Sequence, residues 1–427
     1  MATTTTGTSS GSTNYALGSL PASERVFSWH EHASLWFSLG VGLLVMQMGA
    51  YLVPAVGTRD AAIAILLGTA VGAGLLAWTA KLGADSGLTS AGLMHKTYGH
   101  WFARLPVFLN IAQLIGWTTF ELVIMRDGTL AILKQSLGLP LEGWVGNAAT
   151  TLLWGAVLTL LLAGSMTQLV RKIIGRYGLP LVLLSLLWLS WQFGGKVQSH
   201  GFAAFMDRAG DGSMGLLAAM DLVIAMPVSW LPLVADYARF GKSGRGAFSG
   251  TWVGYAVANV WCYALGVMVA SVSAPDADLV GTLLLAQGGL IALSLILVDE
   301  IDNAYGDVYS GAVSTHSLLP KWSIRTWGML LAVLCTVLAL VLPMHDLEPF
   351  LLMLSSVFVP LYGVILGRLG FAETRGSSGV KVDFVAAGIW IAGIVVFQVL
   401  TNLAPQWGAT LPTLLLTGVL AVVTRKP

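Results

Sequence analysis

Residues 226–232 read MPVSWLP, and two prolines there interrupt an apolar stretch, residues 215–238, that is long enough to span a membrane. Proline lacks a backbone N–H and breaks a helix in its interior. The first apolar stretch of the chain carries a second interruption, GAYLVP at residues 49–54. Interrupted helices at matching positions of two halves are typical of inverted repeats with a binding site at the membrane midplane. The alternative is that the prolines only kink their helices, which is common in membranes.

The composition supports a protein with many membrane spans. Hydrophobic residues make up 56% of the 427 residues and charged residues 10%, a ratio outside the range of soluble domains. The net charge of +1 argues against nucleic acid as a partner. Cys262 and Cys335 lie in apolar runs as packing residues. No histidine spacing predicts a metal site, and no nucleotide-binding motif predicts a cofactor or a primary pump.

Twelve apolar segments of roughly 20 residues each predict spanning helices. They lie at residues 33–56, 60–82, 104–132, 144–163, 175–193, 215–238, 246–272, 281–312, 324–343, 347–369, 382–401 and 407–423. We expect an all-helical membrane protein in which five helices are repeated in inverted orientation and helices one and six are discontinuous. The predicted parts are a disordered cytoplasmic tail, two repeats, and a pair of final helices with a short cytoplasmic C-terminus, at residues 1–32, 33–193, 215–369 and 382–427.

Basic residues predict the orientation, because Lys and Arg collect on the cytoplasmic side. With the N-terminus inside, seventeen basic residues fall on the inner side and five on the outer side. The inner set is Arg25, Lys81, Lys96, Arg104, Arg171, Lys172, Arg176, Arg239, Lys242, Arg245, Lys321, Arg325, Arg368, Arg375, Lys381, Arg425 and Lys426. The outer set is Arg59, Arg126, Lys134, Lys196 and Arg208. Both termini are therefore expected in the cytoplasm and the chain in the inner membrane.

The eighth segment contains an acidic stretch, LILVDEIDNAYGDVYSG at residues 295–311. A carboxylate at the bilayer centre costs roughly 2.5–3.5 kcal/mol on insertion scales, so four of them require a reason. In one interpretation they bind a cation or carry a proton whose gradient drives transport. In another, the helix is shorter and Asp307 lies at the cytoplasmic mouth. Membrane-embedded proteolysis is disfavoured, because it needs a second aspartate motif that the sequence lacks.

On a helix these side chains form two neighbouring stripes. One consists of Asp299, Asp302, Asn303, Gly306 and Ser310, and the other of Glu300 and Asp307. The third segment carries a further polar face, with Asn110, Gln113, Trp117 and Glu121 in NIAQLIGWTTFEL. Such a face suits a flat polar ligand, which stacks on the indole while amide and carboxylate take its hydrogen bonds. The alternative is an interhelical polar contact with Trp117 as ordinary packing.

Three stretches together resemble the cytosine, allantoin and hydantoin branch of the nucleobase:cation symporters. They are VADYARFGKSGRG at residues 234–246, LIGWTTFEL at 114–122 and DNAYGDVYSGAVS at 302–314. MPVSWLPLVADYARF and QLIGW are most similar to bacterial members assigned to cytosine or hydroxymethylpyrimidine uptake. The resemblance implies twelve helices in a five-plus-five fold, with ligand held between broken helices one and six and helices three and eight.

The resemblance also implies substrate-binding residues. Trp117 takes the place of the aromatic side chain that stacks on the base, and Glu121 stands where the hydantoin transporter has a glutamine. Pro227 occupies the position of the second aromatic, so Trp230 is the nearest replacement for it. Helix one is expected to contribute its interrupted backbone around Gln47, Met48, Gly49 and Tyr51, and helix eight to contribute Asn303.

For the coupling ion, sodium-coupled relatives use backbone carbonyls of helix one and two adjacent hydroxyl residues of helix eight. One alignment places Asp302 and Asn303 at the hydroxyl positions, and another places Asp299 and Glu300 there. Either replaces hydroxyls by carboxylate or amide, which favours protons or leaves sodium in doubt. Gly49 in helix one and Ser310, with Ser314, in helix eight are further candidate ligands.

We therefore expect a secondary active symporter, not an enzyme, that imports a pyrimidine-type base, cytosine or hydroxymethylpyrimidine, with H+ or Na+ and no cofactor. Its partners would be this ring and the bilayer, with no obligate protein partner. A purine, allantoin or hydantoin-like ring is the alternative substrate, and a channel or receptor on the same scaffold is the remote alternative. The base, the ion, its stoichiometry, the register of helix eight and the oligomeric state stay open.

Overall fold

A computed structural model describes residues 15–141, 143–164, 177–274, 278–371 and 380–425. The described parts are helical apart from connecting loops and two isolated bridges, Phe27 with Gly241 and Gly57 with Ala209. The helices of the first half are α1 (Trp29–Ser38), α2 (Leu43–Val56), α3 (Thr58–Ser86), α4 (Ser90–Tyr98), α5 (Arg104–Leu137), α6 (Gly143–Leu162), α8 (Leu179–His200) and α9 (Phe202–Met206). Those of the second half are α10 (Leu216–Ser229), α11 (Leu231–Ala238), α12 (Gly244–Val272), α13 (Leu279–Leu284), α14 (Gly289–Leu318), α15 (Ile324–Val341), α16 (Leu347–Leu369), α17 (Phe384–Leu403) and α18 (Thr410–Val423).

The expected all-helical membrane fold is confirmed. Within the described residues, eight helices are long and apolar enough to cross a membrane, and α1 with α2 makes a ninth as one broken span. The other three predicted segments correspond to α8, α14 and α18. Of these, α14 carries the acidic stretch and α18 is only 14 residues long. The count of twelve spans therefore stays a prediction, although each predicted segment corresponds to a helix or a broken pair.

Helix one is broken, but not where Gly49 and Pro54 suggested. The interruption lies at residues 39–42, where α1 and α2 meet at an angle of 59°. The expectation of an interrupted backbone around residues 47–51 is wrong, because these residues are continuous helix within α2. Gly40 and Gly42 weaken the helix at the true break, whereas Pro54 is accommodated near the end of α2.

Helix six is interrupted only at Trp230 and continues as one span, Leu216–Ala238, without a bend as sharp as that of helix one. Its two parts, α10 and α11, meet at Trp230. Pro227 lies in the last turn of α10, and Pro232 in the first turn of α11, where its missing N–H costs nothing.

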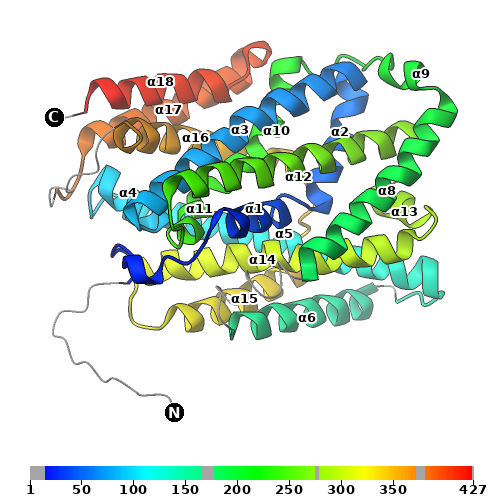
Figure 1. Ribbon diagram of the computed structural model, residues 1–427, viewed down its shortest axis with the longest axis horizontal. Coiled ribbons are helices and arrows are strands. Elements are labelled where there is room, and N and C mark those ends of the chain that lie inside the picture. Colours follow the sequence, from blue (N-terminus) through cyan, green and yellow to red (C-terminus); the bar gives the residue numbers. More distant parts are fainter. Residues whose placement is uncertain (1–14, 142, 165–176, 275–277, 372–379, 426–427) are drawn as a thin grey trace.

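Ten of the helices pack in two groups, and α16, α17 and α18 pack on one another as a further set. The first consists of α1, α2, α3, α10, α11 and α12, and the second of α5, α6, α14 and α15. Figure 1 shows α3, α10 and α12 lying above α14, α15 and α6. The contacts are reciprocal, since α1 and α2 pack on α12, while α10 and α11 pack on α3. This exchange of partners is what two inverted repeats produce, and it supports the predicted five-plus-five arrangement.

The structure differs from the expected tail at residues 1–32. From Tyr15 onward the chain packs on the helices, with Leu20 and Phe27 each only 1% exposed. Leu20 N–H donates to Gly87 O at 2.9 Å, Phe27 N–H to Phe240 O at 2.8 Å, and Lys242 N–H to Phe27 O at 2.8 Å. This part, residues 15–28, is here called the N-terminal segment. Residues 1–14 of the expected tail lie outside the described residues.

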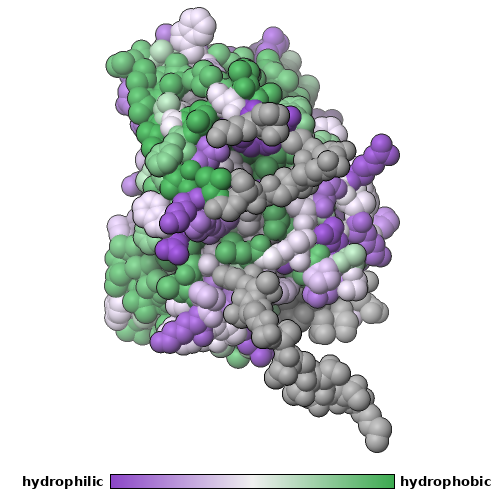
Figure 2. Space-filling model, turned by 90° about the vertical axis from the view of Figure 1, so that its left-hand side faces the viewer, coloured by the Kyte–Doolittle hydropathy of each residue, from purple (hydrophilic) through white to green (hydrophobic). Residues whose placement is uncertain are grey.

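The N-terminal segment and the end of α18 lie at the same, left-hand end of the bundle in Figure 1. Figure 2 looks onto this end and shows hydrophilic side chains scattered across it, with hydrophobic surface at its upper and left-hand margins. The shared end agrees with termini on one side of the membrane, and the assignment of that side to the cytoplasm stays a prediction. Of the basic residues used for it, Arg171, Lys172, Arg176, Arg375 and Lys426 lie outside the described residues.

Candidate binding and coupling site

A cavity lies where the two broken helices meet α5 and α14. Its lining comes from Leu39, Val41, Gly42, Leu44, Val45, Trp117, Glu121, Met226, Ser229, Trp230, Glu300, Asn303 and Asp307. The open space has a volume of about 20 Å³, which is room for water and not for a ring. The structure is thus closed around this site, and a larger ligand requires side chains or helices to move.

Two tryptophans form the aromatic part of the lining. Trp117, from α5, is 6% exposed and meets the ring of Phe350 edge-on, with ring centroids 5.1 Å apart. Trp230, at the break of helix six, meets Trp36 edge-on at 6.0 Å. The indole N–H of Trp117 has no hydrogen-bond partner among the described residues. The pairing of these two tryptophans at one cavity agrees with the sequence prediction, whereas Pro227 is turned away and packs close to Gly72.

The helix of the eighth predicted segment, α14, contacts the break between α1 and α2 through Glu300 and Asn303. The carboxylate of Glu300 accepts hydrogen bonds from Leu43 N–H and from Asn303 Nδ2, the latter at 3.1 Å. Asn303 Nδ2 also donates to Val41 O at 3.1 Å. The backbone groups freed by the break are therefore satisfied by α14, and an acid lies at the N-terminus of α2, where the helix dipole favours negative charge.

Two more acids, Glu121 and Asp307, line the same cavity. Glu121 interacts directly with Glu300 across it, and its Oε2 has no hydrogen-bond partner in the described part of the chain. Asp307 is 2% exposed, so it does not lie at an open mouth. No Lys, Arg or His is found among the described lining residues. Asp307 is the residue that sequence reasoning missed, although its seven-residue spacing from Glu300 put both on one stripe.

Asp299 and Asp302 belong to a separate polar cluster outside this cavity. Ser38, the last residue of α1, donates to Asp299 Oδ1 at 3.0 Å and to Asp302 Oδ2 at 3.3 Å. Both acids are buried, and neither forms an ion pair with the described basic residues. The C-terminal end of α1 adds partial negative charge. The cluster therefore requires a proton or a cation for charge balance.

The other predicted site residues lie outside the cavity. Gln113 Nε2 donates to Asn110 Oδ1 at 3.0 Å and to Ser229 O at 3.2 Å, which holds α5 against the break of helix six. Ser310 donates to Asp236 instead of facing helix one. Gln47 and Gly49 lie in α2 away from the break, and Gly49 packs against the backbone of α12.

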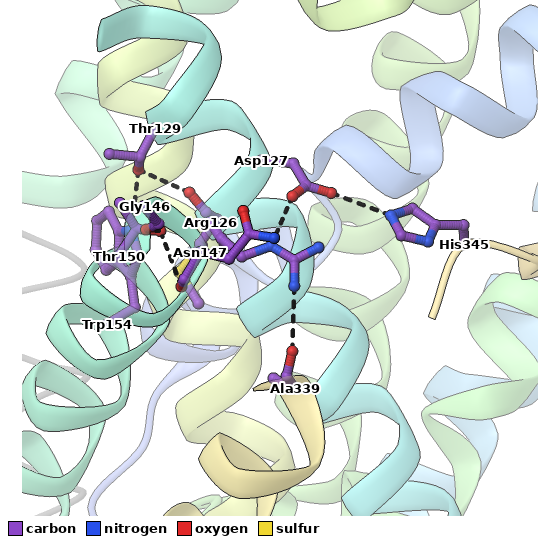
Figure 3. A network of polar contacts seen from close by, with 10 residues as sticks. Arg126, Asp127, Thr129, Gly146, Asn147, Thr150, Trp154, Ala339 and His345 are labelled. Atoms are coloured by element: carbon purple, nitrogen blue, oxygen red, sulfur yellow. Dashed lines mark hydrogen bonds and ion pairs between the residues drawn. The ribbon is translucent and has the colours of Figure 1, made fainter. Parts of the chain in front are cut away.

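A third polar cluster, drawn in Figure 3, joins α5 to the connection between α15 and α16. Arg126 Nε donates to Asp127 Oδ1 at 2.7 Å and Arg126 Nη1 to Ala339 O at 3.1 Å. Asp127 Oδ2 lies 3.2 Å from His345 Nε2 on the far side. Nearby, Tyr51 of α2 donates to Glu348 of α16. These contacts fasten the start of α16, whose Phe350 covers Trp117.

Solved structures share this fold. The structure of Mhp1, a nucleobase-cation-symport-1 family transporter, in a closed conformation with bromovinylhydantoin bound has a TM-score of 0.75 at 14% identity, covering 96% of this chain and 93% of that one. The inward-facing conformation of Mhp1 has a TM-score of 0.74 at 14% identity, covering 96% and 91%. MhsT in complex with L-phenylalanine has a TM-score of 0.60 at 14% identity, covering 92% and 98%. At these identities the likeness establishes the fold.

The family follows from the sequence comparison. A family model described as "Permease for cytosine/purines, uracil, thiamine, allantoin" matches residues 19–371. The chain belongs to this permease family, and the branch within it stays a prediction. The vitamin B6 transporter TPN1 of Saccharomyces cerevisiae is 23% identical over 340 residues, which cover 72% of this chain and 56% of TPN1. The chain thus spans about half the length of this relative.

Proposed function

We propose that this chain is a secondary active symporter that imports a pyrimidine-type base, cytosine or hydroxymethylpyrimidine, by alternating access. The observation that carries the proposal is the closed cavity at both helix breaks, where Trp117 and Trp230 lie beside Glu121 and Glu300. Indole rings bind a flat heteroaromatic ring by stacking, and carboxyl groups accept hydrogen bonds from its edge.

The small cavity supports alternating access over a channel. The open space of about 20 Å³ is too small to hold a ring. A base can enter or leave only when one group of helices moves relative to the other, which is the transport cycle that broken-helix folds use. Glu300 and Asn303 hydrogen-bond to the break of helix one, so in this proposal both would respond when the helices move.

Protons are the coupling ion that the site favours. Asn303 donates an N–H to Val41 O, a backbone carbonyl of the break, so this oxygen already accepts one hydrogen bond. Asp299 and Asp302 share one hydroxyl donor, that of Ser38, and lie next to the same break. A carboxyl pair of this kind can bind a proton on one side of the membrane and release it on the other.

The test is uptake of labelled cytosine into proteoliposomes under an imposed proton gradient and, separately, an imposed sodium gradient. We expect accumulation against the cytosine gradient with protons and none with sodium alone. Unlabelled hydroxymethylpyrimidine should compete, and purines, allantoin, hydantoin and pyridoxine should compete less. Uptake that stops at equal concentrations would identify a channel, and binding without uptake a receptor. Failure of every ring to bind would overturn the proposal.

A further inference from the structure

Two carboxyl groups meet at the wall of the cavity, that of Glu121 from α5 and that of Glu300 from α14. They lie in hydrogen-bonding contact with each other. Glu121 is 4% exposed and Glu300 is 1% exposed. Two ionised carboxylates in contact repel each other strongly where water is excluded, so one member of such a pair carries a proton. The contact between Glu121 and Glu300 therefore requires a proton between them.

The groups around this pair supply no positive charge. The titratable side chains near it are Asp307 and Asp299 of α14 and Cys262 of α12. Among the described residues that line the cavity, none is Lys, Arg or His. Three or more carboxyl, imidazole or thiol groups converging on a metal site are not found in the described part of the chain either. A proton is thus the counter-charge that fits the pair.

The hydrogen bonds around the pair favour negative charge on Glu300 and not on Glu121. Glu300 accepts from Leu43 N–H and from Asn303 Nδ2, the latter at 3.1 Å. It also lies at the N-terminus of α2, where the helix dipole favours an anion. Glu121 Oε2, in contrast, receives no hydrogen bond from the described residues. A protonated Glu121 carries its own donor and can give it to the carboxylate of Glu300.

Both members of the pair belong to the same group of helices. Because α5 and α14 pack on each other, Glu121 and Glu300 stay together when the two helix groups move. Ser38 lies on α1, in the other group, and donates to Asp299 and Asp302 on α14. Movement of the groups therefore separates Ser38 from its two acceptors but leaves the Glu121–Glu300 pair intact.

We propose that Glu121 and Glu300 share a resident proton, held by Glu121 as a carboxylic acid throughout the transport cycle, and that the cavity closes on its ring only while this proton is bound. The inference rests on the proposed function for the ring, and it goes beyond that function because the transported proton is assigned to Asp299 and Asp302. Loss of the resident proton at alkaline pH leaves two adjacent anions at the cavity, and their repulsion opposes closure.

Infrared spectroscopy of the purified full-length protein tests the proton without any ring. A protonated carboxylic acid has its own C=O stretching band, and the spectrum of Glu121→Gln at neutral pH should lack one such band of the wild type. Asp299→Asn and Asp302→Asn should retain the band that Glu121→Gln loses. The result should be the same in potassium and in sodium buffer. A Glu121→Gln spectrum with no band lost, or a band that sodium removes at constant pH, would overturn the inference.

Equilibrium binding of labelled cytosine at a series of pH values tests the role in closure. In the wild type, affinity should fall on the alkaline side by up to about 10-fold per pH unit, the dependence that a single proton produces. In Glu121→Gln the amide N–H can donate to Glu300 at every pH, so the dissociation constant should change by less than about 2-fold over the same range. A flat wild-type profile, or an equally steep one in Glu121→Gln, would contradict this role.

Asp60→Asn is the control for both measurements. Asp60 is an exposed acid in the first turn of α3 and does not line the cavity. Its variant should keep the infrared band and the pH profile of the wild type, which shows that removing any one carboxylate does not produce the effect.

The charge moved per molecule of cytosine distinguishes the resident proton from the transported one. In proteoliposomes this ratio should be the same in the wild type and in Glu121→Gln, because the resident proton does not cross the membrane. A ratio lower by one in Glu121→Gln would make Glu121 a coupling site and overturn the resident assignment. If Glu121→Gln loses the band but no ring binds or accumulates, the proposed function falls and the shared proton stands. If cytosine accumulates and the band is unchanged, only the inference falls.

Discussion

The ring of Trp117 is held in place by its neighbours on α5 and α16. Its ring meets Phe350 edge-on, and Phe120 packs against Phe350 with ring centroids 5.1 Å apart. Aromatic clusters of this kind fix the plane of each ring and gain about 0.5–1.5 kcal/mol per pair beyond buried area. A base that binds beside Trp117 thus finds a surface already in position, and the loss of ordering entropy on binding is small.

Replacing Trp117 by alanine should weaken cytosine binding by at least about 10-fold, because both stacking and apolar contact are lost. Trp117→Phe should retain part of the affinity, since a smaller aromatic face remains. Binding of labelled cytosine to the purified variants is the measurement. Trp144→Ala is the control, because Trp144 in α6 is 63% exposed and distant in the fold. Full affinity in Trp117→Ala would show that the ring binds elsewhere.

Gly49, a predicted ion ligand, packs tightly against α12. A Cβ at this position would lie 2.2 Å from the backbone oxygen of Tyr263, a distance that only movement of α2 or α12 can relieve. Gly74 in α3 has nothing within 4 Å of such a Cβ. The two glycines therefore form a matched pair within membrane helices.

We expect Gly49→Ala to destabilise the protein by roughly 1–3 kcal/mol through overpacking. Gly74→Ala should be neutral or slightly stabilising, because alanine favours a helix more than glycine. Thermal unfolding of both variants in detergent tests this difference. Equal melting temperatures would mean that α2 and α12 are not tightly packed here.

The sequence predicted some of these residues through helical spacing. Trp117 and Glu121 lie four residues apart on one face, and the structure places both at the cavity. Asp307 was not predicted to line the cavity, because a charged residue near the end of a helix is usually exposed. Only the tertiary structure shows that α14 continues to Leu318. The signal of Gly49 was ambiguous, because glycine is common both at breaks in helices and where two helices pack closely.

At the level of the element, α14 serves two sites with two of its faces. Glu300, Asn303 and Asp307 follow spacings of three and four and face the cavity. Asp299 and Asp302 follow a spacing of three and meet the end of α1. The sequence predicted two stripes but assigned Asn303 to the wrong one, because neighbouring stripes on a helix differ by a single residue.

Substitutions on the two faces of α14 should impair different steps of transport. Asp299→Asn and Asp302→Asn should abolish proton-driven accumulation of cytosine but leave its binding within about 3-fold, because these acids do not line the cavity. Accumulation and equilibrium binding are measured side by side on each variant. Cytosine exchange across the membrane, which needs no net proton movement, should persist. Loss of binding in both variants would instead place these acids in the substrate site.

The break of helix one shows what spacing alone misses. Residues 39–42 contain no proline, yet the helix stops there because α14 supplies partners for the freed backbone groups at Val41 and Leu43. A stretch that would be marginally helical in isolation is thus opened by a side chain 257 residues away. Proline marked the region of helix six correctly, because that signal is local.

At the level of the whole molecule, buried polar contacts concentrate where the two helix groups meet. Asn110 of α5 donates to Pro232 O in α11 at 2.9 Å, and Tyr237 of α11 donates to Gly306 O in α14 at 3.0 Å. Ser38 and Leu43 contact α14 in the same way. Within membranes such hydrogen bonds contribute about 0.6 kcal/mol on average. An interface held by exchangeable hydrogen bonds can open at low cost, while each group stays rigid.

The membrane orientation can be tested on the intact protein, because both native cysteines are buried. Ser213→Cys, in the loop before α10, should react with a membrane-impermeant maleimide in intact cells. Lys242→Cys, in the loop before α12, should react only after the cells are permeabilised. Both positions are exposed, so access decides the result. The reverse pattern would place the N-terminal segment outside the cytoplasm.

The pairing of Ser38 with Asp299 also has a consequence for biosynthesis. The two residues are separated by 261 positions, which a ribosome covers in about 13–52 s at 5–20 residues per second. The first span enters the bilayer long before α12 and α14 exist, and its second part, α2, carries no charged residue. The acids of α14 are synthesised later, when their hydrogen-bond donors on α1 and α2 are already in the membrane. Because the donors on α1 and α2 are inserted first, the carboxyl groups of α14 have hydrogen-bond partners when they enter the bilayer.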